Sequence, residues 1–176
     1  MLRNQPGEPG LERRLAVAQE LYAAHGAALR GDPEISRLLI EYLQSIGRSQ
    51  AMMQRHGVFA ACAECAGTHG GASCCFAGAE EWYGELLLLI NLLLGVELPV
   101  QGDGGQDCFF NGPQGCRLTA HFAICLNFFC PELTQRLGPD RLARLRRQVG
   151  RELIAGQVLE GALLGWFRGQ GVAVSL

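Results

Sequence analysis

Eight cysteines lie between residues 62 and 130, and the rest of the 176-residue chain contains none. Thiolate sulfur binds zinc and the iron of iron–sulfur clusters. In a chain without signs of export, cysteines gathered this densely are more typical of metal binding than of disulfides. The expected ligands are Cys62, Cys65, Cys74, Cys75, Cys108, Cys116, Cys125 and Cys130.

The spacing of these cysteines carries further information. Cys62 and Cys65 form a C-x2-C pair, which lets both sulfurs face one ion or cluster. Cys74 and Cys75 are adjacent. Because neighbouring side chains rarely reach the same ion, one centre and two centres are both open. Cys130 precedes Pro131, and a helix beginning there would favour the thiolate of Cys130 through its dipole and free N–H groups.

The kind of metal follows less directly from the sequence. Structural zinc sites usually combine two short C-x2-C pairs, and this chain has one. The wider spacing of the other cysteines suits an iron–sulfur cluster at least as well, and nearby phenylalanines could shield such a cluster from water. Ordinary core packing is the alternative for these phenylalanines, and buried free thiols or disulfides are the alternatives for the cysteines. The phenylalanines are Phe76, Phe109, Phe110, Phe122, Phe128 and Phe129.

The order of the cysteines resembles the YkgJ-like family, small cysteine-cluster proteins described as zinc- or iron-chelating and often labelled iron–sulfur oxidoreductases. CAEC and the following Cys-Cys pair are similar to the first half of the family pattern; CFFNGPQGC and RLTAHFAICLNFFCP are similar to the second half. The resemblance covers about residues 62–131 and implies a metal or cluster centre. Two features differ: eight residues separate Cys65 from Cys74, a longer spacing than in the family, and Ala120-His121-Phe122 lies where the family has Arg-Pro.

Histidine offers a second kind of ligand. His69 lies within the first cysteine group and His121 within the second, so either could complete a Cys3His site, although eight thiols make imidazole unnecessary. His56 is expected at a helix end, and His25 is expected to be packed or half-exposed beside the apolar face of the first helix.

All fifteen basic residues are arginines. The absence of lysine excludes Schiff-base catalysis and the lysine of phosphate-binding loops. With a net charge of −2, the chain has no general attraction to nucleic acid, which we do not expect as a partner. Arg141, Arg144 and Arg151 share one helix face; we expect a solvated surface there, with phosphate contact as the alternative.

Apolar periodicity predicts an all-α fold: a helical bundle with an irregular cysteine-rich metal-binding segment packed against it. We expect a single domain, 1–176, with N-terminal helices in 1–58, a cysteine-cluster segment with one central helix in 59–131, and C-terminal helices in 132–176. The expected helices cover about 10–29, a second helix from Asp32-Pro33 to about Arg55, 79–94 and 139–169, with irregular loops around the first four cysteines and over 99–115. Glycines at 150, 156, 161 and 165 suggest a kink in the last helix.

The polar N-terminus lacks the apolar stretch of a signal peptide, which predicts a cytoplasmic protein. The apolar run from Leu86 to Val96 is too short to span a bilayer, so no membrane association is expected. We expect a metal- or iron–sulfur-cluster-binding protein, with a redox or protein partner and one-electron transfer as its role if the centre is redox-active. The alternative is a structural zinc-binding module serving protein–protein interaction. No catalytic constellation is recognisable, and whether the protein is an enzyme is left open.

Overall fold

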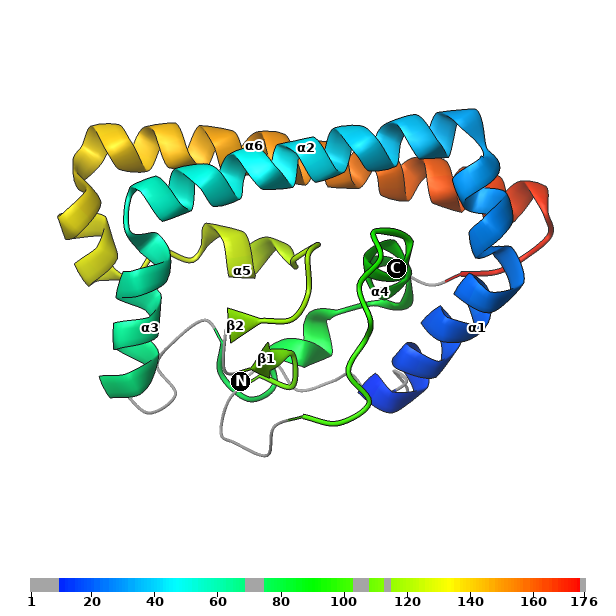
Figure 1. Cartoon of the computed structure of the whole chain (residues 1–176), viewed down its shortest axis with the longest axis horizontal. Helices are drawn as coiled ribbons and strands as arrows, with labels where there is room; N and C mark the ends of the chain where they lie inside the picture. Colours follow the sequence, from blue (N-terminus) through cyan, green and yellow to red (C-terminus); the bar gives the residue numbers. More distant parts are fainter. Residues whose placement is uncertain (1–9, 69–74, 103–107, 113–114, 175–176) are drawn as a thin grey trace.

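The chain folds into an assembly of helices with one very short hairpin (Figure 1), which confirms the all-α expectation. The computed structural model describes residues 10–68, 75–102, 108–112 and 115–174, with only the backbone described for residues 63 and 65–68. The elements are α1 (Leu11–Gly31), α2 (Pro33–Arg55), α3 (Val58–Thr68), the 3-10 helix η1 (Ala79–Trp82), α4 (Glu85–Leu93), β1 (Asn111–Gly112), β2 (Gly115–Cys116), α5 (Ala123–Asn127) and α6 (Pro131–Gly169).

The first two helices lie close to where the sequence places them. Asp32 separates them: its Oδ1 accepts hydrogen bonds from the backbone N–H groups of Glu34 at 3.0 Å and Ile35 at 3.1 Å. Pro33 takes the first helical position, where its missing N–H costs nothing. This cap allows α1 and α2 to follow one another with a sharp change of direction.

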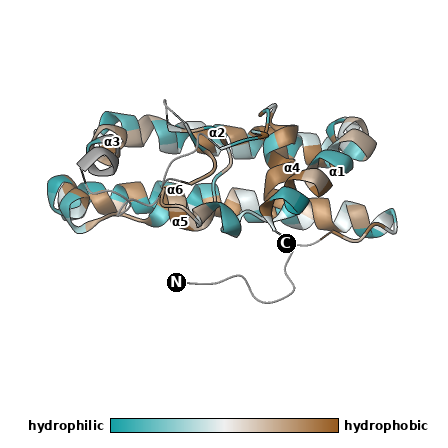
Figure 2. Ribbon diagram, turned by 90° about the horizontal axis from the view of Figure 1, so that it is seen from below, coloured by the Kyte–Doolittle hydropathy of each residue, from teal (hydrophilic) through white to brown (hydrophobic). Residues whose placement is uncertain are grey.

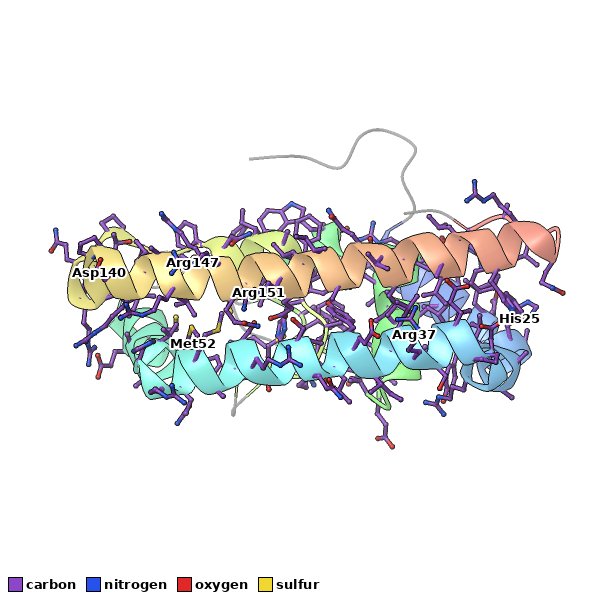
Figure 3. The ribbon with its side chains drawn as sticks, turned by 90° about the horizontal axis from the view of Figure 1, so that it is seen from above. His25, Arg37, Met52, Asp140, Arg147 and Arg151 are labelled. Atoms are coloured by element: carbon purple, nitrogen blue, oxygen red, sulfur yellow. The ribbon has the colours of Figure 1, made fainter. Side chains whose placement is uncertain are left out.

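The long helices α2 and α6 run antiparallel, side by side, along the whole molecule (Figures 1 and 3). The ring of Tyr42 on α2 packs directly against Gly156 of α6: a Cβ atom at residue 156 would lie 3.2 Å from the tyrosine ring. Helices α1 and α3 extend from opposite ends of α2 to the same side of this pair. Between them lie α4, α5 and the hairpin; Cys116 lies in the hairpin and Cys125 in α5.

Helix α6 bends near its beginning. Gly138 has φ 70° and ψ 167°, a left-handed conformation that favours glycine, and Pro139 follows it. The expected kink at the later glycines was wrong: from Pro139 to Gly169 the helix is continuous. Glycine lowers helix stability by only about 1 kcal/mol, and packing against α2 offsets such a cost.

Helix α4 is the buried centre of the fold (Figure 2), as the apolar run predicts. It begins later than expected, because Tyr83 and Gly84 leave helical geometry and separate η1 from α4. Arg30 of α1 caps its C-terminal end by donating to the carbonyl oxygens of Leu92 and Leu93 at 3.1 Å each. A cation there also favours the negative end of the helix dipole. No helix in the described part of the chain combines the length and the apolarity needed to cross a bilayer.

The region around the first C-x2-C pair differs from the expectation. Cys62 and Cys65 lie on helix α3, not in a loop. The glycines that predicted a loop begin only at Gly67, in the last turn of α3, so they do not disturb the helix around the two cysteines. Two further short elements, α5 and the β1–β2 hairpin, also form in segments expected to be irregular or unassigned.

A polar layer lies between α2 and α6. Ser45 and Ser49 of α2 and Gln148 and Glu152 of α6 are all buried. Gln148 donates to the carbonyl oxygen of Ser45 at 3.4 Å. Neither carboxylate oxygen of Glu152 has hydrogen-bond geometry with a described residue, and Glu152 is 1% exposed. Burial raises its pKa, and the neighbouring Ser49 hydroxyl lowers it only in part.

From the burial of Glu152 we predict that the contribution of this residue to the free energy of unfolding falls as pH rises. Because burial raises the pKa of Glu152 in the folded protein above the ordinary value of a glutamate, folding favours the protonated carboxyl, and the stability that this gives is lost as pH rises from the ordinary pKa through the raised one. We expect Glu152→Gln to raise the free energy of unfolding by about 1–3 kcal/mol at pH 7. Urea unfolding at pH 7 and pH 4 measures this, and the gain should disappear at pH 4. Glu41→Gln, at an exposed site, is the control; an equal gain at both pH values would contradict the prediction.

Candidate metal centre

Three cysteines from separate segments meet around the hairpin. The backbone N–H of Cys108 donates to the carbonyl oxygen of Cys75 at 2.7 Å. Three residues later the chain enters β1, where Asn111 pairs with Cys116 of β2. Arg117 holds this turn closed: its Nη2 donates to the carbonyl oxygen of Phe109 at 2.8 Å. The hairpin therefore fixes the backbones of Cys75, Cys108 and Cys116 relative to one another.

Tyr83 connects a fourth cysteine to this group. Its side chain is 1% exposed, and its hydroxyl accepts a hydrogen bond from the backbone N–H of Phe122 at 3.2 Å. The same hydroxyl donates to Sγ of Cys125 at 3.7 Å. Burial raises the pKa of Tyr83 well above its ordinary value, and the nearby charges of Cys125 and Cys116 raise it further. The phenol therefore stays protonated and acts as a donor to sulfur.

Asn91 positions the chain that joins Cys116 to Cys125. This fully buried side chain of α4 accepts from the backbone N–H groups of Thr119 at 2.8 Å and Ala120 at 2.9 Å through Oδ1. Its Nδ2 donates to the carbonyl oxygens of Ala120 and Leu87 at 3.0 Å each. All hydrogen-bonding positions of the amide are used, as a buried amide requires.

One carboxylate, that of Glu80, acts on Cys108. Glu80 lies close to it, and Oε2 of Glu80 accepts from the backbone N–H of Phe109 at 3.3 Å. The pKa of Cys108 is raised to about 12, mainly by burial and then by Glu80, Cys116 and Cys125, while a hydrogen bond from the backbone of Phe110 lowers it in part. The thiol is thus neutral at physiological pH unless a cation stabilises the thiolate.

Aromatic rings surround this group of cysteines. Tyr83 packs edge-on against Phe110, with ring centroids 4.9 Å apart, and Trp82 contacts Phe122 at 5.7 Å. Phe109 packs edge-on against Phe110 at 5.3 Å. Cys108 and Cys125 are half-buried in the same apolar cluster, whereas Cys116 is exposed. The rings therefore shield Cys108 and Cys125 from water in part, whereas Cys116 is open to it.

A second group of cysteines lies between α3 and the beginning of α6. Cys62 and Cys130 pack against one apolar cluster that includes Met53 and Leu126. Cys130 is the N-cap of α6: its Sγ accepts from the backbone N–H of Leu133 at 3.4 Å. The expectation that Cys130-Pro131 opens a helix is confirmed.

The predicted ligands are only partly gathered. Cys74 and His69 lie outside the described residues, and so does the side chain of Cys65. Among the residues that the structure describes, no three histidine, cysteine or acidic side chains are close enough together to hold a metal ion. His121 is hydrogen-bonded to the backbone of Thr119, and burial lowers its pKa, so the ring is neutral. The described cysteines fall into two neighbourhoods, Cys75, Cys108, Cys116 and Cys125 near the hairpin and Cys62 with Cys130 at α3, and neither brings three side chains within reach of one ion.

Two other histidines are placed as the sequence predicts. His56 ends α2 as its C-cap. His25 is half-buried and packs edge-on against Trp166 and Phe167, with ring centroids 5.6 Å from each.

Comparison with known proteins adds no relative: no family model, no curated protein and no solved structure matches this chain. The resemblance to the YkgJ-like family stays a prediction from the cysteine order.

The sequence did not identify two residues that organise the site. Asn91 interrupts an otherwise apolar run, and a polar residue in a buried helix is a signal that a hydrogen-bond partner exists. Nothing in the sequence indicates that this partner is the backbone of residues 119 and 120. Nothing in the sequence marks Tyr83 as a site residue, because its hydroxyl is hydrogen-bonded to the backbone of Phe122, almost forty residues later in the chain.

Replacing Asn91 tests this organisation. In Asn91→Leu, the buried N–H groups of Thr119 and Ala120 lose their acceptor, so we expect a destabilisation of about 2–5 kcal/mol. We also expect Cys125 to react faster with a disulfide reagent, because the chain leading to it is no longer held against α4. Urea unfolding and thiol titration with mass spectrometry measure the two effects. Asn127→Leu, an exposed change on α5, is the control; unchanged reactivity of Cys125 would remove the positioning role.

Proposed function

We propose that this protein binds a metal ion or an iron–sulfur cluster through its cysteines, with an iron–sulfur cluster as the first candidate. The observation that carries the proposal is the arrangement around Tyr83: Cys125 is hydrogen-bonded to the tyrosine hydroxyl, and the charges of Cys116 and Cys125 act on both Tyr83 and Cys108. Cys75 is joined to Cys108 through the backbone. Four of the eight candidate ligands thus belong to one neighbourhood.

The electrostatics of this neighbourhood support a cationic occupant. Several thiols and Glu80 share a half-buried region in which each negative charge makes the next ionisation harder. A bound metal ion or cluster would supply the positive charge that stabilises the thiolates. The Tyr83 hydroxyl would donate to a ligand sulfur, which is the kind of outer hydrogen bond that tunes a metal site. Cys62, Cys65, Cys74 and Cys130 are the remaining proposed ligands.

The aromatic rings and the exposure of Cys116 favour different metals. Rings around Cys108 and Cys125 would exclude water, which suits a redox-active cluster that passes single electrons to a partner. The exposed thiol of Cys116 instead favours structural zinc, whose function would be to hold the loops in place for a protein partner. Structural zinc is therefore the second candidate.

Metal analysis distinguishes these candidates. Protein purified without air from its native host should be brown and contain iron and sulfide in stoichiometric amounts. Cys108→Ser and Cys125→Ser should each lose most of this metal, whereas Tyr83→Phe, which keeps every thiol, should retain it. Colourless protein with stoichiometric zinc would end the redox version. Protein without metal, with its cysteines in disulfides, would end the proposal.

Cys130 needs a separate test because it has a structural role as well. Serine can replace the cap, whereas alanine cannot, so we expect Cys130→Ala to be less stable than Cys130→Ser by about 1 kcal/mol. If Cys130 is also a ligand, both variants lose metal to the same extent. Urea unfolding and metal content measured on both variants separate the two roles. A Cys130→Ser variant with full metal content would limit Cys130 to capping.

A further inference from the structure

The outer face of the α2–α6 pair carries an apolar groove. This face points away from α4, α5 and the cysteines, and Figure 3 shows it from above. The groove is lined by Leu38, Glu41, Arg151, Ile154, Ala155 and Val158.

Two of the lining side chains are unusually exposed for their type. Ile154 is 62% exposed and Val158 is 50% exposed, and they lie one helical turn apart on α6. Leu38 and Ala155 form the floor between the two helices. Apolar side chains gathered in a hollow are typical of a surface that receives another protein segment.

Arginines continue this face toward the beginning of α6. Arg144, Arg147 and Arg151 are exposed, and spacings of three, four and seven residues place them along one side of the helix. Figure 3 shows Arg147 and Arg151 on the outer face. Arg48 and Arg55 follow Glu41 at successive intervals of seven residues on α2 and are also exposed. Within the described residues, none of these five arginines forms an ion pair, whereas Arg37 pairs with Glu41 at 2.6 Å.

We propose that this face binds an acidic amphipathic helix of a partner protein. The apolar side chains of that helix would enter the groove at Ile154 and Val158, and its carboxylates would pair with Arg144, Arg147 and Arg151. The length from Arg144 to Val158 corresponds to roughly 21 Å, or about four turns of the incoming helix.

Charge and shape select this occupant over others. A second copy of the chain would bring two arginine-rich faces together, and the like charges would repel. A bilayer is flat, so it would leave the floor formed by Leu38 and Ala155 uncovered. A nucleic acid would pair with the arginines but leave Ile154 and Val158 unused.

A designed peptide tests the proposal. The probe is a fluorescein-labelled four-turn helix with leucines at i, i+3, i+4 and i+7 and glutamates elsewhere, and its binding to the full chain is measured by fluorescence anisotropy. We expect Ile154→Glu and Arg151→Glu each to weaken binding at least tenfold. Ile40→Glu is the matched control, because Ile40 is 55% exposed on α2 but does not line the groove. Its binding should be unchanged.

Three results would overturn the proposal. The first is equal binding of a peptide in which every glutamate is replaced by lysine. The second is no binding of the acidic peptide by folded protein, with folding checked by circular dichroism. The third is tighter binding of a single-stranded RNA, or of phosphatidylserine vesicles, that depends on Arg151 but not on Ile154.

Discussion

The buried amide of Asn91 is the interaction on which the cysteine region depends. Helix α4 is apolar and surrounded by other elements, so a polar side chain there must be satisfied within the protein. Asn91 meets this requirement with the backbone of a segment 28 and 29 residues later in the chain. One amide therefore fixes the position of residues 119 and 120, and with them the approach of Cys116 and Cys125 to Tyr83. Apolar contacts alone would allow this segment to slide along α4; directional hydrogen bonds do not.

The two longest helices, α2 and α6, contain none of the cysteines. Helices α2 and α6 form a long frame (Figure 1), and Cys116 and Cys125 lie in the short elements between α1 and α3, with Cys108 just before the hairpin. Hydrogen bonds with backbone groups hold these short elements: Arg117 donates to a carbonyl oxygen, Tyr83 and Asn91 accept from N–H groups, and the backbones of Cys108 and Cys75 are joined directly. Such an arrangement positions sulfur atoms without requiring the loops to build a core of their own.

The sequence predicts local features better than distant contacts. Asp32 and Pro33 place the boundary between α1 and α2 because a cap depends only on neighbouring residues. The apolar stripe of α2 and the helix opening at Cys130-Pro131 are local in the same sense. Helix α3 was missed because the glycines after Cys65 dominate the composition, although they lie at its end. The break at Tyr83-Gly84 is not indicated by the periodicity, whereas the bend at Gly138 precedes Pro139, the residue at which the last helix is expected to begin. The candidate ligands are visible from residue type, but which of them meet depends on Asn91 and Tyr83.

The bend at Gly138 divides α6 into a short arm and a long rod. The left-handed backbone at this glycine interrupts helical geometry, so the turns from Pro131 to Leu137 run in a different direction from the rest of α6. Cys130, the N-cap of the short part, packs against the same apolar cluster as α3. Leu133 and Leu137 before the bend and Leu142 and Val149 after it are buried in that one cluster, so a change in bonding at Cys130 would reach the long part of α6 through side-chain packing across Gly138 and not through a continuous helical backbone.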